Sequence, residues 1–341
     1  MRRLAAAVLV VVVALGAAAA VAGFSIWQRI HAPHKAYDAV EQLIDIPAGT
    51  GTAEIGRRLV DAGIVRDGFT FRAALWWTGR SRALQAGEYR FDRPLAAVDV
   101  VDRLARGDVY ARRITFPEGL TIEEMARVYE AREFGTAASF VEAARDAPLV
   151  RDFDPQAPDL EGYLFPDTYA LPRGTPARRL AALMVERFRE TYGDDLRRRA
   201  EAQGLTTRQV VTLASLVEKE TGRADERPLV AAVYRNRLKL GMGLQADPTI
   251  VYALQQAGRY DGNIRRQDLA VDSPYNTYRH AGLPPGPIAA PGKASLEAAL
   301  LPAPVSYLYF VSRNDGSHVF ATTLAEHNRN VRQFQIRYFR R

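Results

Sequence analysis

The chain has 341 residues, of which 48% are hydrophobic, 25% are charged and none is cysteine. This composition fits one large core or two ordinary domains, and it excludes a disordered chain and a disulfide-stapled mini-protein. Thiol catalysis, cysteine-ligated zinc and iron–sulfur clusters are excluded as well. The net charge of +7 does not indicate a nucleic-acid partner, because Arg is interleaved with Asp and Glu over residues 201–227 and is not gathered with aromatic residues.

An uncharged apolar segment, Leu4–Phe24, lies close to the amino terminus. Its 21 residues would make about 31 Å of helix, which is enough to cross a bilayer core. Arg2 and Arg3 precede the segment, and Trp27 follows it. The positive-inside rule therefore predicts a cytoplasmic amino terminus and an exported remainder.

A cleaved signal peptide is the alternative, since small residues at 18–22 match a cleavage pattern. The apolar run is long for such a peptide and has no polar end, which favours a retained single-pass anchor. We expect residues 1–27 to form a cytoplasmic stub and transmembrane anchor, with a linker over residues 28–39.

Residues 40–135 are predicted to form a small α+β module with a weak internal repeat of strand and helix. Leu43–Gly49 alternates as a strand does, and Thr52 can cap a helix that stops at Gly63. Between the two copies of the repeat we expect a helix around Phe69–Trp77, a strand at Gly87–Phe91 and a helix through Val98–Leu104.

The second copy of the repeat begins at Arg113–Gly119. Thr121 and Glu124 then form a capping box at the start of its helix. Short strand–helix folds of this kind resemble the LysM-like modules that hold N-acetylated sugars. A spacer or packing domain is the alternative for this module.

The segment Leu160–Tyr169 combines aromatic and acidic side chains around a Gly and a Pro. Flat rings beside polar acceptors are what a sugar-binding cleft requires, which makes Glu161, Tyr163 and Asp167 candidates for substrate contact. The alternative is that the rings are ordinary core anchors at a domain junction.

Residues Thr207–Glu220 are predicted to form a nearly buried helix, because their apolar side chains cover an arc of roughly 220°. Glu218 and Glu220 project inside that arc. A carboxyl group in apolar surroundings is costly unless it is paired or protonated, and desolvation raises its pKa toward values useful in a general acid. The alternative is a buried ion pair with Arg223, Arg227 or Arg235.

Downstream, Asp225–Pro228 starts another helix that ends at Gly241, and Asp247 is expected as the N-cap of the next. The long Pro- and Gly-rich loop Ser273–Ile288 is of the kind that lines sites. A C-terminal hairpin and helix are predicted from Tyr307–Ser312, His318–Thr322 and the capping pair Thr323 and Glu326.

Five segments in this order resemble the endolytic murein transglycosylase (YceG-like) family. They are LEGYLFPDTY (160–169), LASLVEKET (213–221), VYRNRLKLGMGLQADPTIVY (233–252), YNTYRHAGLPPGPIAAPG (275–292) and YLYFVSRNDGSHVFATTLAEHN (307–328). The resemblance spans about 200 residues and implies an α+β catalytic domain over residues 136–341. Leu216 stands where Ile is frequent and Ala246 where a hydroxyl residue is expected, so one substrate hydrogen bond is in doubt.

The resemblance implies a membrane-anchored lyase, a lytic transglycosylase without cofactor or metal. It would cut the MurNAc-β-1,4-GlcNAc bond within nascent peptidoglycan, leave 1,6-anhydro-MurNAc ends and so terminate glycan polymerisation. Glu218 matches the catalytic position of the family. Supporting or substrate-binding candidates are Glu220, Glu161, Tyr163, Asp167, Gln245, Asp247, Asn276 and Tyr278.

The implied partners are peptidoglycan glycan strands and peptidoglycan synthases (penicillin-binding proteins). Two alternatives stay open: a muramidase that hydrolyses the same bond with water, and a non-catalytic wall-binding scaffold in which the buried acids are structural. No histidine spacing in the sequence matches a metal motif.

Overall fold

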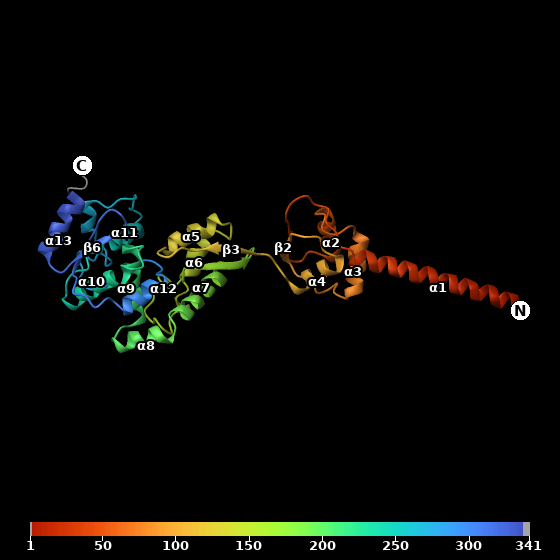
Figure 1. The fold of residues 1–341 in the computed structure, drawn as a ribbon, viewed down its shortest axis with the longest axis horizontal. Helices are drawn as coiled ribbons and strands as arrows, with labels where there is room; N and C mark the ends of the chain where they lie inside the picture. Colours follow the sequence, from red (N-terminus) through yellow and green to blue (C-terminus); the bar gives the residue numbers. More distant parts are fainter. Residues whose placement is uncertain (1, 337–341) are drawn as a thin grey trace. The chain divides into compact units, whose positions relative to one another are not determined.

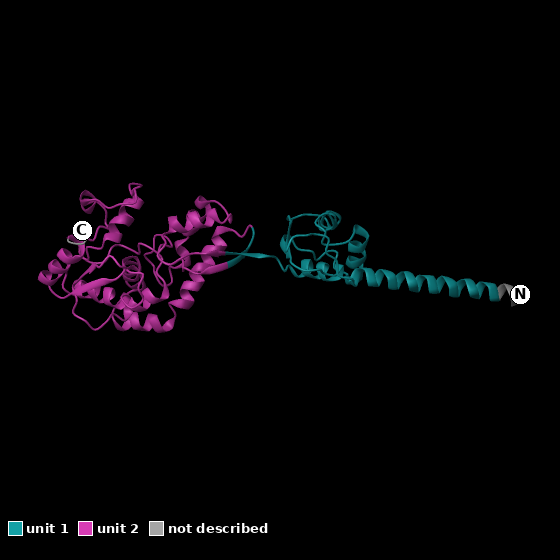
Figure 2. Cartoon of the chain, turned by 45° about the horizontal axis from the view of Figure 1, so that its top comes forward, with its two compact units in different colours: residues 1–113, 170–173 teal, residues 114–169, 174–341 magenta. Residues whose placement is uncertain are grey.

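The computed structural model describes residues 2–336. It divides into two compact units, residues 1–113 with 170–173 and residues 114–169 with 174–341 (Figures 1 and 2). Helices and two-stranded sheets are mixed along the chain. Met1 and residues 337–341, which the predicted anchor and catalytic domain include, lie outside the described residues.

The smaller unit begins with a long helix, α1 (Arg2–His31). Its segment Ala6–His31 is long and apolar enough to cross a membrane, and the apolar 18-residue window within that segment has no residue buried inside the protein. The helix runs to His31, past residue 27 where the predicted anchor ends and into the predicted linker. It continues since Ile30 is only 1% exposed and packs into the core of the following module.

The module of the smaller unit consists of β1 (Gln42–Ile46), α2 (Thr52–Asp61), α3 (Gly68–Thr78), β2 (Gly87–Phe91) and α4 (Ala97–Arg106). Strand β3 (Ala111–Thr115) follows and crosses the boundary between the two units. Strands β1 and β2 pair antiparallel, from Gln42 opposite Phe91 to Ile46 opposite Gly87. Side chains point to alternate sides along each strand, so one side of each strand packs into a core that it shares with α2, α3 and α4. Thr52 is the first helical residue and not the predicted cap, because Gly51 holds the N-cap position.

The larger unit is mainly helical. Its elements are α5 (Ile122–Ala131), α6 (Ala137–Ala144), a 3₁₀ turn (Ala147–Leu149), β4 (Thr168–Pro172), α7 (Ala177–Thr191), α8 (Asp194–Ala202), α9 (Thr207–Glu220), α10 (Arg227–Lys239), α11 (Asp247–Gln256), a 3₁₀ turn (Arg266–Ala270), α12 (Lys293–Leu300), β5 (Tyr309–Ser312), β6 (His318–Ala321), α13 (Leu324–Val331) and a π-helical turn (Arg332–Ile336). β3 pairs with β4, and β5 with β6.

The division between the compact units falls after residue 113, earlier than the predicted module boundary at residue 135. The second copy of the strand–helix repeat therefore packs with the larger unit. Its capping box is present, since Thr121 accepts from the Glu124 N–H and Glu124 accepts from the Thr121 N–H. The repeat is thus local in the sequence and does not mark one domain.

Helix α9 lies at the centre of the larger unit and packs against α8, α10, α11 and α12 (Figure 1). All eight residues from 210 to 217 are buried, which confirms the prediction of a nearly buried helix. The helix spans the predicted residues because a capping box of Thr206 and Gln209 starts it. The last turn, which carries both predicted acids, therefore reaches the end of the core.

Candidate active site

Glu218 lies in the last turn of α9, where the buried helix reaches the protein surface. Its side chain is 6% exposed. One carboxylate oxygen, Oε1, accepts a hydrogen bond from Arg227 Nη2 at 3.0 Å, and Oε2 accepts from the Gly292 N–H at 2.9 Å. Of the three arginines considered from the sequence, Arg227 is the one that pairs with Glu218.

Arg227 is itself held in place from a neighbouring helix. It is the first residue of α10, its side chain is 10% exposed, and its Nε donates to Ser295 Oγ of α12 at 3.1 Å. Gly292 is the N-cap of α12. Its N–H belongs to the amino terminus of a helix, where contact with an anion is favourable. A guanidinium and a helix-terminal amide therefore both donate to the Glu218 carboxyl group.

Two backbone segments, 118–120 and 290–292, form the wall around Glu218. Gly119 N–H donates to the Ala290 carbonyl and Ala290 N–H donates to the Leu120 carbonyl, both at 2.8 Å. Lys219 Nζ donates to the Gly119 carbonyl at 3.0 Å. Gly119 has φ +79°, and a Cβ there would lie 3.6 Å from Glu218 Cγ. Residues far apart in the sequence thereby enclose the acid.

Glu118 is a second carboxyl group at this wall, and sequence reasoning missed it. Its Oε2 lies 3.6 Å from Arg227 Nη2, the same nitrogen that binds Glu218. It also packs on Gly292, where an added Cβ would meet Glu118 Oε1 at 1.8 Å. Burial and the nearby Glu218 raise the pKa of Glu118. The sequence carried one signal for Glu118: it is an acidic residue at the point where the strand pattern of residues 113–119 ends.

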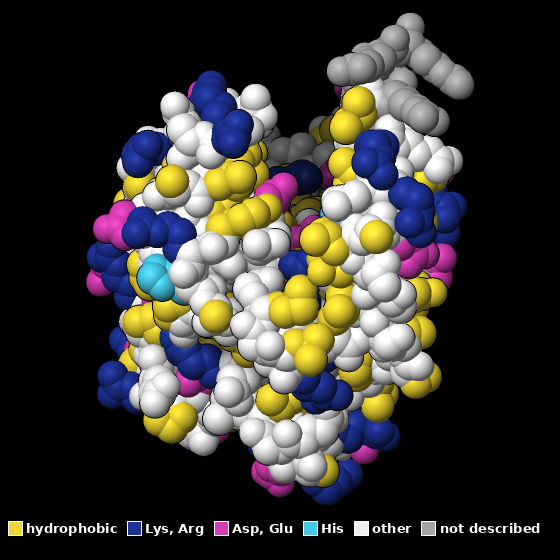
Figure 3. All heavy atoms as spheres, turned by 90° about the vertical axis from the view of Figure 1, so that its left-hand side faces the viewer, with side chains coloured by type: hydrophobic (Ala, Val, Ile, Leu, Met, Phe, Trp, Pro, Cys, Tyr) yellow, Lys and Arg dark blue, Asp and Glu magenta, His cyan; other side chains and the backbone are white. Residues whose placement is uncertain are grey.

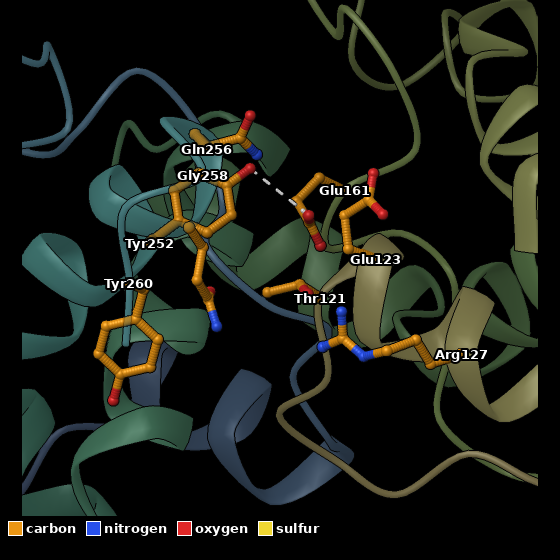
Figure 4. Close-up of a pocket in the computed structure, with 9 residues that line it drawn as sticks. Thr121, Glu123, Arg127, Glu161, Tyr252, Gln256, Gly258 and Tyr260 are labelled. Carbon is orange, nitrogen blue, oxygen red and sulfur yellow. Dashed lines mark hydrogen bonds between the residues drawn. The ribbon is translucent and has the colours of Figure 1, made fainter. Parts of the chain in front are cut away.

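Glu161 lies in a pocket of about 410 Å³ between the start of α5 and α11 (Figure 4). Both carboxyl oxygens lie 3.3 Å from the Ile122 N–H donor, and Tyr252 Oη donates to Oε2 at 3.4 Å. Burial raises the pKa of Glu161 to about 8. The residue is therefore placed in a cavity, and its surroundings favour the neutral carboxylic acid at pH 7.

Arg127, Thr121 and Glu123 face Glu161 from one side of this pocket, and Gln256 and Tyr260 line the side of Tyr252 (Figure 4). Polar donors and acceptors around a cavity of this size are what a sugar ring requires. The segment 118–122 connects the pocket to the Glu218 wall, because Gly119 contacts Glu218 and the Ile122 N–H contacts Glu161.

Glu220 lies at the centre of a separate polar cluster. Its Oε1 accepts from Tyr234 Oη at 2.5 Å, and burial raises the pKa of Glu220 to about 7. The charge of Asp247 acts in the same direction, and the charge of Arg237 opposes it. Asp247 in turn accepts from Tyr278 Oη at 2.5 Å. The structure thus brings three of the predicted residues together.

Gln245 and Asn276 shape the loops beside this cluster. Gln245 is exposed with φ +49°, and its N–H donates to the Thr277 carbonyl at 3.2 Å. Asn276 is fully buried, and its side-chain amide donates to the carbonyls of Leu269 and Val271. Asn276 is therefore placed to hold a loop.

Asp247 is not the N-cap that the sequence predicted. Ala246 occupies that position in an extended conformation, and the helix begins at Asp247 itself. The carboxylate is thereby free of a capping role and accepts the hydrogen bond from Tyr278.

Tyr163 and Asp167 lie away from these acids. Tyr163 is 1% exposed, packs against Phe153 and Phe188, and donates to Asp154 Oδ2 at 2.5 Å. This is the position of a core anchor, the alternative considered from the sequence. Asp167 pairs with Arg187 at 2.8 Å on the surface, so neither residue is positioned beside Glu218.

The face at the left of Figure 1, which carries α10, α11 and α13, is shown with its side chains in Figure 3. Basic side chains are spread over its rim and mixed with acidic and apolar ones, and the surface is hollowed near its upper middle. The charge is dispersed and forms no single basic stripe on this face.

Known proteins resemble the chain over most of its length. Residues 44–333 match the model of the YceG-like family. An endolytic murein transglycosylase of Bacillus subtilis is 32% identical over 303 residues, which cover 84% of this chain and 82% of the relative. One of Streptococcus pneumoniae is 30% identical over 324 residues, covering 84% of this chain and 57% of the relative.

A solved structure gives the same result for the fold. The crystal structure of a yceG-like protein from Listeria monocytogenes is 30% identical and superposes with a TM-score of 0.60. The match covers 85% of this chain and 98% of that chain.

Proposed function

The chain belongs to the YceG-like family, and from this premise we propose that it is an endolytic lytic transglycosylase of peptidoglycan. The observation that carries the proposal is the Glu218 carboxyl, held at the end of a buried helix by Arg227 and the Gly292 amide. The names of the relatives from B. subtilis and S. pneumoniae support the same reaction and substrate.

In the proposed reaction a single carboxyl group acts twice. Protonated Glu218 gives its proton to the oxygen between MurNAc C1 and GlcNAc C4, and the C1–O bond breaks with both electrons leaving on that oxygen. The carboxylate then removes the proton of the MurNAc C6 hydroxyl, whose oxygen bonds to C1 and forms the 1,6-anhydro ring. Water is neither consumed nor released, so one acid group is sufficient, unlike in the two-carboxylate glycosidases.

Arg227 and Gly292 suit the second half of this cycle, because they stabilise the carboxylate. The first half requires a proton on Glu218, and we assign Glu118 a positioning role in placing it. Glu118 lies beside the same guanidinium nitrogen as Glu218, and its raised pKa lets it hold a proton next to Glu218.

The Glu161 pocket is proposed as a subsite for a sugar ring of the strand. A neutral carboxylic acid, Arg127 and Gln256 can donate to hydroxyl and acetamido oxygens. Gln245, Asp247 and Tyr278 are proposed as further substrate contacts, with Glu220 and Asn276 supporting them. A glycan strand that occupies several of these contacts at once would be cut at a bond within the strand.

The membrane placement belongs to the same proposal. Helix α1 would hold the chain in the inner membrane with a cytoplasmic amino terminus, which puts the remainder on the periplasmic side, where peptidoglycan synthases (penicillin-binding proteins) release their product. The strand–helix–helix–strand order of β1, α2, α3 and β2 supports a LysM-like module.

Mass analysis of the products tests the reaction. The full chain is incubated with purified glycan strands, and we expect fragments with 1,6-anhydro-MurNAc ends from cuts inside the strand. Reducing ends that incorporate labelled oxygen from water would replace the proposal with a muramidase. Strands that are bound and left intact would replace it with a wall-binding scaffold.

A further inference from the structure

Helix α3 of the smaller unit has two unlike faces. Its buried face consists of Thr70, Phe71, Ala74 and Leu75, each 5% exposed or less. Its outer face, here called the aromatic face, consists of Phe69, Arg72, Trp76 and Trp77. Phe69, Trp76 and Trp77 are 50%, 82% and 54% exposed, and at about 100° per residue the four lie on one side of the helix. Folding of the module does not require these exposed rings.

A continuous series of rings connects the aromatic face to α1. Phe24 and Trp27 have ring centroids 6.1 Å apart, Trp27 and His31 4.6 Å, and His31 meets Trp77 edge-on at 6.0 Å. The three α1 residues follow one side of that helix, from Phe24 at the end of the apolar run to His31. The aromatic face therefore continues a ring surface that starts on the apolar helix itself.

Arg29 fixes the two helices against each other. Its Nε donates to Thr70 Oγ1 at 2.8 Å, and its guanidinium pairs with Asp67, the N-cap of α3. Ile30 is buried in the module core beside this pair. Because α1 and α3 are joined by an ion pair and a shared core, the depth of α1 in a bilayer would set the depth of α3.

The part of α1 from Trp27 to His31 corresponds to the headgroup layer of the bilayer. His31 follows Trp27 by one helical turn, about 6 Å along the axis. Tryptophan is enriched at this level of membrane proteins, because its ring is apolar and its N–H needs a polar partner. Trp77, which contacts His31, would lie at the same level.

Basic and polar groups next to the aromatic face complement phospholipid phosphates. Arg66 and Arg72 are exposed. A hollow of about 420 Å³ lies between α1 and α3, lined by Ser25, Ile26, Gln28, Arg29, Ala32, Arg66 and Phe69. An aromatic surface with adjacent arginines is the composition of an interfacial helix on an anionic membrane.

We propose that the aromatic face of α3 lies in the interfacial layer of the bilayer that α1 crosses, with phospholipid headgroups bound at Arg66 and Arg72. The proposal rests on α1 as the membrane anchor in the proposed function. A ring platform for glycan and a surface for a protein partner are the other uses of such a face. The ring series that begins on α1 favours lipid over glycan or a protein as the partner of the aromatic face.

The three tryptophans of the chain allow a direct test with the full-length protein. It is reconstituted into vesicles of phosphatidylethanolamine and phosphatidylglycerol, with or without bromine on the lipid acyl chains. In the variant Trp27→Phe the tryptophan emission, excited selectively over that of tyrosine, comes from Trp76 and Trp77. We expect their emission to shift to shorter wavelength relative to detergent solution, and to lose intensity most with bromines near the headgroup end of the chains.

The matched variant Trp76→Phe/Trp77→Phe reports on Trp27 alone. Quenching of Trp27 without quenching of Trp76 and Trp77 would overturn the lipid proposal while α1 remains a membrane anchor. Absence of quenching in both variants would remove the anchor as well. Analysis of the cleavage products in the same samples measures the transglycosylase reaction independently of the quenching.

Two further measurements address the ligand class. In Arg66→Gln/Arg72→Gln, also carrying Trp27→Phe, we expect brominated phosphatidylglycerol to lose its advantage over brominated phosphatidylethanolamine as a quencher. If glycan fragments shift the emission of Trp76 and Trp77 in detergent while brominated lipids leave it unchanged, the aromatic face is a sugar platform and the proposal is wrong.

Discussion

Two carboxyl groups of the larger unit are withdrawn from solvent and are held in opposite ways. The Glu218 side chain is 6% exposed, and Glu161 as a whole residue is 7% exposed. Glu218 accepts from a guanidinium and a helix-terminal amide, whereas Glu161 accepts from the Ile122 amide and the Tyr252 hydroxyl, which carry no charge. The charge of the hydrogen-bond partners is therefore what distinguishes the two sites.

The comparison explains why burial inside an apolar arc was an incomplete criterion for a catalytic acid. Glu161 has the strongly raised pKa, and the groups that hydrogen-bond to it carry no charge. Glu218 has a charged hydrogen-bond partner, Arg227, and lies on the wall formed by 118–120 and 290–292. We infer that the acid–base cycle belongs to Glu218, and that Glu161 contributes a neutral hydrogen-bonding group.

The largest expected effect is that of Glu218→Gln. The amide keeps the size of the side chain and cannot carry the proton, so we expect the release of anhydro-ended fragments to fall by about 10²- to 10⁴-fold. Glu142→Gln is the matched control, because the Glu142 side chain is 74% exposed and pairs with its helix neighbour Arg145. Full activity in a Glu218→Gln protein that unfolds at the wild-type temperature would move the catalytic role elsewhere.

The second prediction concerns stability and pH. The pKa of Glu161 is about 8 in the folded protein, against an ordinary value of 4.5. The folded state therefore holds its proton more tightly than the unfolded state does. The free energy of unfolding should fall as pH rises from the ordinary pKa through about 8, by at most about 1.4 kcal/mol per pH unit from this group.

Glu161→Gln removes this titration, so its unfolding free energy should depend less on pH over that window. Urea unfolding at a series of pH values measures the difference. Glu220 has a pKa of about 7, so it also makes the free energy of unfolding fall as pH rises. This contribution should persist in Glu161→Gln, and it should level off at a lower pH than the contribution of Glu161 does. Parallel curves for the wild type and Glu161→Gln would show that Glu161 ionises normally and would remove the contrast with Glu218.

The sequence was most informative where local signals decide the structure. Helix α9 and strand β2 span the predicted residues, and the capping box at Thr121 forms as expected. The position of Glu218 inside the buried arc of α9 also follows from periodicity alone. In each case the information lies within a few residues of the element.

Tertiary contacts limited the remaining predictions. Arg227 could not be chosen over Arg223 or Arg235 without the packing of α10 on α9. Glu118 meets Glu218 across 100 residues of chain, through the backbone pairing of 119 with 290. The extension of α1 to His31 depends on the burial of Ile30 in the module. None of these contacts has a periodic signal.

The smallest expected effect distinguishes Glu118 from an ordinary surface acid. In Glu118→Gln the carboxyl group whose pKa is raised can no longer hold a proton beside Arg227 and Glu218. We expect kcat/KM to fall about tenfold, and the alkaline limb of the pH–rate profile to move to lower pH, because Glu118 no longer supplies a proton to the site.

Gly292→Ala provides an independent way to displace Glu118. The new Cβ would meet Glu118 Oε1 at 1.8 Å, and the half-exposed carboxyl can swing outward. Gly292 has φ −77°, so alanine fits the backbone, and its N–H still donates to Glu218. The alkaline limb should therefore move in the same direction as in Glu118→Gln, by a smaller amount. An unchanged limb in both variants would mean that Glu218 obtains its proton without help from Glu118.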